Sequence, residues 1–204
     1  DCLREKIRDE FFEIHYQVQQ DLGSDRVRGM EALARLNCAE LGNISPFEFI
    51  RIAEYTGLIV PLGNLVLRNA CFQGKKWLES GFYIGKLSVN ISVNQLRNDT
   101  FYDDVCRIVN ETGFPYELLE LEITESVFLD HSDENTEILS KLRDLGISIA
   151  LDDFGTGYSS LNYLTVLPID TLKIDKSFLG KSLDELSHTE IIKTIIELAH
   201  ILDL

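Results

Sequence analysis

The chain has 204 residues, of which 45% are hydrophobic and 26% charged, a composition typical of a globular protein with a substantial core. Thirty-four acidic residues against nineteen lysines and arginines give a formal net charge of −15. This charge argues against broad contact with a nucleic-acid backbone, which requires a basic surface. It permits a small phosphate ligand held through a metal ion, because a bound cation reverses the local sign.

The four cysteines (Cys2, Cys38, Cys71 and Cys106) are far apart in the chain, so no CxxC motif indicates a zinc or redox site. We expect free thiols in a reducing cytoplasm. No apolar run reaches the roughly 18 residues of a membrane span. The chain begins at Asp1 without an initiator methionine, so we expect a piece of a longer protein, which could be anchored to a membrane through another domain.

Strand-like apolar runs alternate with amphipathic helical patterns along the chain. Strands are expected at 11–18, 27–33, 86–91, 118–124, 147–151 and 171–174. Helices are expected from Ser45-Pro46 to near Gly57 and at 62–79, 100–111, 133–145 and 187–199. Repeated strand–helix–strand units predict an α/β fold with a mostly parallel sheet. Because no linker or repeat divides the chain, we expect one domain over residues 1–204.

The strands favour a (β/α) barrel over a doubly wound sheet, because each has one apolar and one polar face. The polar face carries Ser, Asn and Ser in 87–92, and Glu, Glu and Thr in 119–124. It carries Ser, Ala and Asp in 147–152, and Lys and Asp in 172–175. In a barrel these side chains would meet at the carboxyl ends of the strands, where the active sites of that fold lie.

Five acidic or amide residues occupy positions where apolar residues would be expected: Glu31, Asn90, Glu122, Asp152 and Asp153. Carboxylates gathered in a poorly solvated mouth repel one another unless they are protonated or bind a cation. All-oxygen ligands favour Mg²⁺ or Mn²⁺, and this many would suit two ions and attack of water on a phosphodiester. The alternative is a structural network in which these groups pair with Lys and Arg.

Residues 152–160, Asp-Asp-Phe-Gly-Thr-Gly-Tyr-Ser-Ser, form the most distinctive segment. Adjacent aspartates on a strand point to opposite faces, so both reach one site only if the chain turns between them. Gly155 and Gly157 permit such a turn. The alternative is an ordinary strand-to-helix loop.

Five blocks in order resemble the EAL-domain family of cyclic di-GMP phosphodiesterases. They are Glu31-Ala32-Leu33 with Arg35, Val89-Asn90-Ile91-Ser92, Glu122-Ile123-Thr124-Glu125-Ser126, the segment 152–160, and Leu172-Lys173-Ile174-Asp175. The resemblance extends from about Arg4 to Leu204. It implies a modified TIM barrel that linearises cyclic di-GMP to pGpG with Mg²⁺ or Mn²⁺, by in-line attack of a water bridged between two ions.

The resemblance also implies roles for individual residues. Glu31, Asn90, Glu122, Asp152 and Asp153 would bind metal, Lys173 would contact the attacking water or a phosphate, and Glu125 would position the loop after Asp153. Arg35 would hold a phosphate, Gln17 and Leu33 would line the ligand site, and Asp153 would also face substrate and take part in catalysis. The family further implies a homodimer, and fusion to sensory or diguanylate-cyclase domains.

The sequence departs from the family pattern in three places. Val18 stands where Pro is usual, and Leu36 stands where Trp is common. The family also continues past Leu204 with strands carrying another metal-site glutamate and a ligand-binding glutamine, so we expect the last strand–helix units of the barrel to be missing from this chain. Two other functions stay open: a cyclic di-GMP receptor without turnover, and a protein-binding scaffold.

Overall fold

A computed structural model describes residues 2–10, 12–130, 133–155, 164–179 and 186–204. The chain divides into two compact units, Asp1–Glu120 and Leu121–Leu204. The single domain expected over residues 1–204 stays a prediction. None of the helices within the described residues is long and apolar enough to cross a lipid bilayer.

The first unit is built on four strands: β1 (Glu13–Gln20), β2 (Val27–Cys38), β3 (Gly42–Ile44) and β4 (Lys86–Ile91). β2 lies between β1, which runs antiparallel to it, and β4, which runs parallel to it. The short β3 folds back on the end of β2 as a hairpin. Gln17 on β1 and Ser88 on β4 both lie opposite Glu31 on β2.

Helices cover this sheet: α1 (Cys2–Arg8), α2 (Pro46–Thr56), α3 (Ile59–Glu79), α4 (Val93–Leu96) and α5 (Phe101–Thr112). A short 3-10 turn, η1 (Tyr116–Leu118), leads into the next strand. α2 begins and ends as predicted, because Ser45 accepts a hydrogen bond from the Glu48 N–H and Gly57 takes the left-handed conformation at φ 71°.

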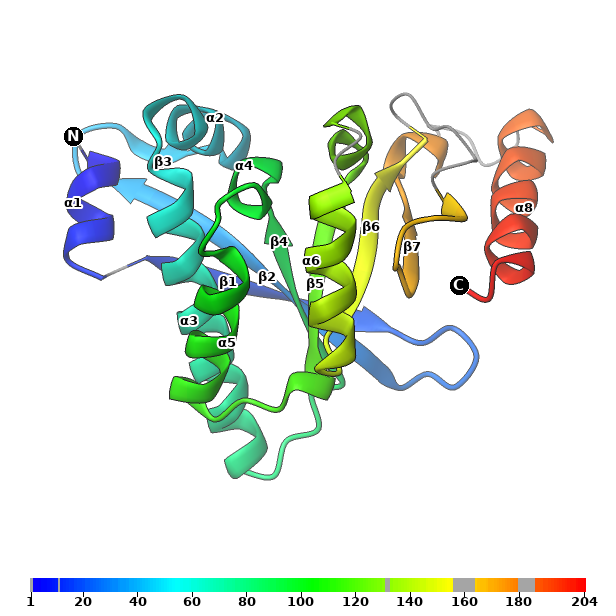
Figure 1. Cartoon of the computed structure of the whole chain (residues 1–204), viewed down its shortest axis with the longest axis horizontal. Coiled ribbons are helices and arrows are strands. Elements are labelled where there is room, and N and C mark those ends of the chain that lie inside the picture. Colours follow the sequence, from blue (N-terminus) through cyan, green and yellow to red (C-terminus); the bar gives the residue numbers. More distant parts are fainter. Residues whose placement is uncertain (1, 11, 131–132, 156–163, 180–185) are drawn as a thin grey trace. The chain divides into compact units, whose positions relative to one another are not determined.

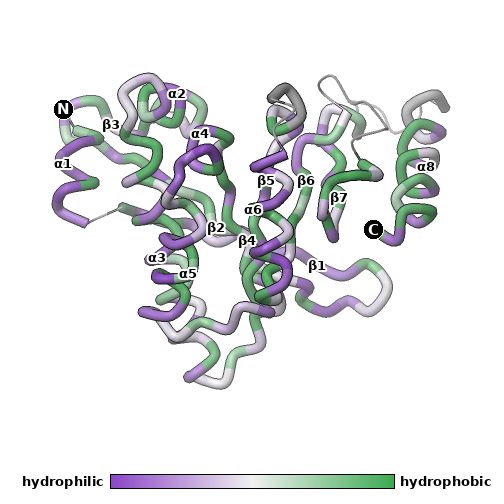
Figure 2. The backbone as a smooth tube through the Cα atoms, in the orientation of Figure 1, coloured by the Kyte–Doolittle hydropathy of each residue, from purple (hydrophilic) through white to green (hydrophobic). Residues whose placement is uncertain are grey.

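α3 and α5 lie side by side over the first unit (Figure 1). Hydrophobic and hydrophilic residues alternate along α5, as expected for a helix with one buried face (Figure 2). Leu67 of α3 and Ile108 of α5 are fully buried, together with Leu87 of β4. Gly74 of α3 is needed for this packing, because a Cβ there would press on the Phe114 ring.

The second unit contains β5 (Leu119–Thr124), whose first two residues belong to the first unit, β6 (Ser148–Phe154) and β7 (Thr171–Ile174), in the order β5-β6-β7. β6 and β7 are parallel. The remaining elements are η2 (Glu125–Asp130), α6 (Asp133–Asp144), η3 (Lys176–Leu179) and α8 (Leu186–Ile201). Leu142 of α6 and Ile149 and Leu151 of β6 are fully buried.

The predicted α/β class with a mostly parallel sheet is confirmed, and the strands predicted at 86–91 and 171–174 agree to the residue. Other boundaries were wrong by a few residues. β1 begins and ends two residues later than predicted, β2 continues to Cys38, and α3 begins at Ile59 because Pro61 is accommodated in its first turn. The elements α1, β3 and α4 were not predicted.

Candidate functional site

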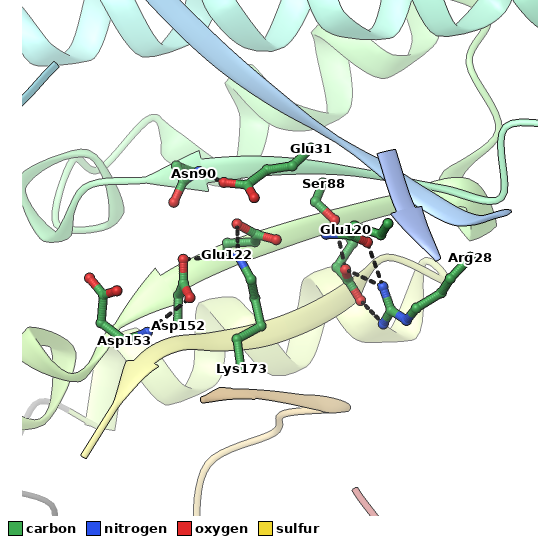
Figure 3. Close-up of polar contacts among 10 residues, drawn as sticks. Arg28, Glu31, Ser88, Asn90, Glu120, Glu122, Asp152, Asp153 and Lys173 are labelled. Atoms are coloured by element: carbon green, nitrogen blue, oxygen red, sulfur yellow. Dashed lines mark hydrogen bonds and ion pairs between the residues drawn. The ribbon is translucent and has the colours of Figure 1, made fainter. Parts of the chain in front are cut away.

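The first unit contributes two predicted metal ligands, which lie on neighbouring parallel strands. Asn90 near the end of β4 donates a hydrogen bond from Nδ2 to Oε1 of Glu31 on β2, at 2.9 Å (Figure 3). Because the amide nitrogen is used on Glu31, the atom that Asn90 can offer to a cation is its oxygen Oδ1.

The predicted ligand-binding residues of the first unit share one face of β1 and β2. Gln17 lies directly opposite Glu31, so the two side chains project from the same side of the β1–β2 ladder. Leu33 and Arg35 follow Glu31 at two-residue steps and therefore lie on that face too. Arg35 is half-buried and donates a hydrogen bond to the carbonyl oxygen of Ala34, and it lines a cavity of about 170 Å³.

The second unit brings together Glu122 of β5, Asp152 of β6 and Lys173 of β7 (Figure 3). The Lys173 ammonium donates to Glu122 Oε2 at 2.6 Å and to Asp152 Oδ2 at 2.9 Å. Carboxylate oxygens of Glu122 and Asp152 lie within 4.8 Å of each other. Burial alone would lower the pKa of Lys173, but the Glu122 and Asp152 carboxylates outweigh it and raise the pKa above the ordinary value. Lys173 is therefore a fixed positive charge at neutral pH.

A β-bulge directs both adjacent aspartates toward this cluster. Two residues, Asp152 and Asp153, stand between the paired positions Leu151 and Phe154 of β6, whereas Lys173 alone stands between the corresponding positions of β7. Asp153 adopts φ 55°, and its N–H donates to Asp152 Oδ1 at 2.9 Å. Figure 3 shows both carboxylates pointing to the same side of the strand end. The turn that the sequence requires between them is present.

Asp175 belongs to the same region but was not among the predicted site residues. Partial burial, together with the neighbouring charges of Asp152 and Asp175, raises the pKa of Asp153 above its ordinary value. The sequence carried the signal, because Asp175 follows Lys173 at the two-residue spacing of a strand face.

Glu125 holds the start of the segment after Asp153. It is almost fully buried and accepts a hydrogen bond at Oε1 from the Gly155 N–H, at 2.7 Å. Gly155 has φ 96°, and a Cβ at this position would overlap the Phe178 ring. Only glycine fits both the backbone conformation and the space. The rest of the distinctive segment, Thr156–Ser160, lies outside the described residues.

A structural network in which an arginine pairs with a buried carboxylate is present at a different glutamate of β5. Glu120 is 1% exposed and receives Arg28 Nη1 and Nη2 on its two oxygens at 3.2 and 3.0 Å, and Ser88 Oγ on Oε1 at 2.7 Å (Figure 3). Gln19 Oε1 accepts a further bond from Arg28. In this network one guanidinium neutralises one carboxylate.

The charge balance around Lys173 is different. One ammonium is shared by the carboxylates of Glu122 and Asp152, and Asp153 adds another acidic group beside them. The atoms that these side chains can offer to a metal ion are all oxygens, the ligands that Mg²⁺ and Mn²⁺ prefer. The residues present in each unit therefore fit a hard divalent cation.

Comparison with known proteins gives the same family as the sequence motifs. Residues 1–204 match the EAL domain. The chain is 37% identical over 202 residues to the cyclic di-GMP phosphodiesterase NbdA of Pseudomonas aeruginosa, covering 99% of this chain and 26% of that protein. It is 35% identical over 202 residues to the cyclic di-GMP phosphodiesterase PdeR of Escherichia coli, covering 99% and 30%.

Among solved structures, the PaMucR phosphodiesterase in complex with c-di-GMP matches with a TM-score of 0.91 and 36% identity. The match covers 99% of this chain and 82% of that one, and MucR is a protein of Pseudomonas aeruginosa. The chain spans between 21% and 30% of the length of the curated relatives that it matches here. The motifs, the fold and these matches together show that the chain belongs to the EAL domain family.

Proposed function

We propose that this chain is the catalytic domain of a divalent-metal-dependent phosphodiesterase that hydrolyses cyclic di-GMP to linear pGpG. The observation that carries the proposal is the retained acidic set in an EAL domain. Glu122 and Asp152 share one lysine, and the bulge turns Asp153 to the same side. Such a set has more negative charge than Lys173 can neutralise.

In this proposal Glu31, Asn90, Glu122, Asp152 and Asp153 hold two Mg²⁺ or Mn²⁺ ions. When bound, the ions would lower the pKa of a water and neutralise charge that develops on the phosphate. Lys173 orients Glu122 and Asp152, because its ammonium donates a hydrogen bond to each. It also supplies a fixed positive charge beside the attacking water or the phosphate.

The remaining predicted residues are proposed to bind the ligand or to position the backbone beside the acidic residues. Glu125 fixes the backbone at Gly155 and so sets the path of the chain directly after Asp153. Arg35 is proposed to hold a phosphate of the ligand, because a guanidinium matches phosphate oxygens in a bidentate way. Gln17 and Leu33 lie on the same strand face as Glu31 and are proposed to line the ligand site.

The test is hydrolysis of cyclic di-GMP by the full-length protein that contains this chain, with Mg²⁺ or Mn²⁺ and with pGpG separated by chromatography. We expect pGpG from the wild type and a loss of at least about a hundredfold in Asp152→Asn, because an amide cannot replace the charge of a ligand carboxylate. The matched control is Glu134→Gln, an exposed acid on α6, which should retain wild-type turnover. Absence of pGpG from the wild type, or equal rates in the two variants, would contradict the proposal.

A receptor without turnover is the second candidate, motivated by Val18 and Leu36 at positions where the family pattern differs. Calorimetric binding of cyclic di-GMP by a wild type that yields no pGpG, with binding kept in Asp152→Asn, would establish it. Homodimerisation and fusion to sensory or cyclase domains stay predictions. Sedimentation of the purified chain measures the first.

A further inference from the structure

An acidic and a basic residue stand directly opposite each other in the first unit. Glu13 on β1 is the cross-strand partner of Arg35 on β2 in the antiparallel ladder. Residues at such positions project to the same side of the ladder, with Cβ atoms about 5 Å apart. Both residues also line the same cavity of about 170 Å³. Because opposite charges placed in this way attract each other, Arg35 is the expected partner of the Glu13 carboxylate.

The Glu13 carboxylate instead pairs with His15. Oε1 of Glu13 lies 2.7 Å from Nε2 of His15, which follows Glu13 at the two-residue step of a strand and therefore projects from the same face. A carboxylate oxygen accepts, so Nε2 is the donor in this contact. The two side chains are 53% and 56% exposed, so the Glu13 carboxylate can turn toward either neighbour without repacking the core.

The Arg35 guanidinium keeps most of its donors. Among the described residues it makes one hydrogen bond, from Nη1 to the carbonyl oxygen of Ala34 at 2.9 Å, and it pairs with no carboxylate. A guanidinium presents five N–H donors in a planar fork that matches the oxygens of a phosphate. The cavity beside it is several times larger than the roughly 30 Å³ share of one water molecule, so a phosphate group fits.

The charges that line this cavity favour an anion only while Glu13 is held elsewhere. Lys6 of α1 and Arg35 are its basic lining residues, and Glu13 is the acidic one among the residues that the structure describes. A Glu13 carboxylate paired with Arg35 would occupy the same donors as a phosphate and would repel it. The partner that Glu13 takes therefore sets how readily Arg35 accepts a phosphate.

We propose that His15 is a positioning residue, which holds Glu13 away from Arg35 and so keeps the guanidinium available for a phosphate group of the ligand. His15 acts through Glu13 and needs no contact with the ligand itself. The phosphate part of this inference rests on the proposed function of the chain. The competition between His15 and Arg35 for Glu13 rests on the contacts within β1 and β2 and can be measured without any ligand.

The first test measures the availability of the Arg35 guanidinium in the full-length protein. Phenylglyoxal modifies arginines, a carboxylate partner slows the reaction, and mass spectrometry follows the peptide that carries Arg35. Arg51, exposed on α2, is the internal reference. His15→Ala should slow modification of Arg35 about two- to fivefold relative to Arg51, the range that an exposed ion pair can impose. His15→Gln, which keeps a donor at Nε2, and the double variant Glu13→Gln/His15→Ala should retain the wild-type rate.

The second test measures the dissociation constant of cyclic di-GMP by calorimetry, with EDTA present to stop metal-dependent hydrolysis. His15→Ala should raise the constant by a similar factor of about two to five, and the double variant with Glu13→Gln should restore it. The matched control is His200→Ala, an exposed histidine on α8, which should bind as the wild type does. Circular dichroism checks the fold of each variant.

Three results would overturn the proposal. The first is an equal rate of Arg35 modification in wild type and His15→Ala. The second is a double variant as slow as His15→Ala, because His15 would then act through a residue other than Glu13. The third is faster modification of Arg35 in the single variant Glu13→Gln, which would show that Glu13 already shields Arg35 in the native chain, and this result needs no change at His15.

Failure of the proposed function gives a different pattern. A wild type that neither binds nor hydrolyses cyclic di-GMP contradicts that function. The rates of Arg35 modification still decide whether His15 or Arg35 holds Glu13, because that measurement contains no nucleotide.

Discussion

Removal of the Arg28 guanidinium should destabilise the first unit more than removal of any surface arginine, because it leaves a buried carboxylate behind. Glu120 is 1% exposed, and two of its three described hydrogen bonds come from Arg28. The third comes from Ser88. In Arg28→Ala the Glu120 charge loses both guanidinium donors, and of its described hydrogen bonds the neutral one from Ser88 remains.

The structure sets the expected magnitude. Breaking a buried ion pair from one side costs about 3–5 kcal/mol. The Arg28 side chain is 37% exposed, so water reaches the pair and lowers our estimate to about 2–3 kcal/mol. Glu120→Gln keeps an acceptor for Ser88 and leaves an arginine that water can solvate, so we expect about 1 kcal/mol. The double variant should lose about 2 kcal/mol, less than the sum of the two single changes.

Urea unfolding followed by the fluorescence of Trp77, the only tryptophan, reports on the first unit, because Trp77 lies on α3 against Tyr16 of β1. With a slope of about 2 kcal/mol/M, Arg28→Ala should lower the midpoint by about 1–1.5 M. Arg107→Ala is the control, since Arg107 is 43% exposed and its ion pairs are worth less than about 1 kcal/mol. Additive costs in the double variant, within about 0.5 kcal/mol, would refute the reasoning.

Three further predictions concern packing, capping and thiol chemistry. Gly63→Ala should cost about 1–3 kcal/mol in urea unfolding, because the new Cβ in α3 overlaps the buried Gln95 amide; an unchanged midpoint would contradict this. Ser45→Ala should lower the free energy of unfolding by about 1 kcal/mol, because α2 loses its N-cap hydrogen bond. An unchanged free energy of unfolding would refute that role. At pH 8 native Cys71 should resist alkylation by iodoacetamide until the chain unfolds, because it is fully buried and its pKa of about 12 leaves about one thiolate in 10⁴. The half-buried Cys106 should be alkylated in the native chain. Rapid labelling of native Cys71 would contradict this prediction.

The strands could be predicted from sequence because each alternates apolar and polar residues with a two-residue period. That period also placed Glu122 and Lys173 on polar strand faces. α1 was missed because seven residues with one buried side chain, Leu3, give too short a pattern. β3 was missed because three residues carry no periodicity at all.

The hydrogen-bond and ion-pair partners of individual side chains could not be predicted, because they depend on tertiary structure. The sequence put Glu120 and Glu122 on one face of a strand, but it gave no indication that Arg28 faces the first and Lys173 the second. The bulge at Asp152 and Asp153 could be stated only as a requirement, because a register shift depends on the neighbouring strand.

The two glutamates of β5 show how the same residue type, two positions apart, serves two purposes. Arg28 offers a planar set of donors that meets both oxygens of Glu120, so one positive charge balances one negative charge. Lys173 is a single point charge divided between Glu122 and Asp152, and two carboxylates against one ammonium leave one negative charge before Asp153 is counted. The first arrangement is complete with protein groups alone. Among the contacts described, the second leaves negative charge that a bound cation would balance, and this difference is the physical reason to propose a metal ion at Glu122 and a structural ion pair at Glu120.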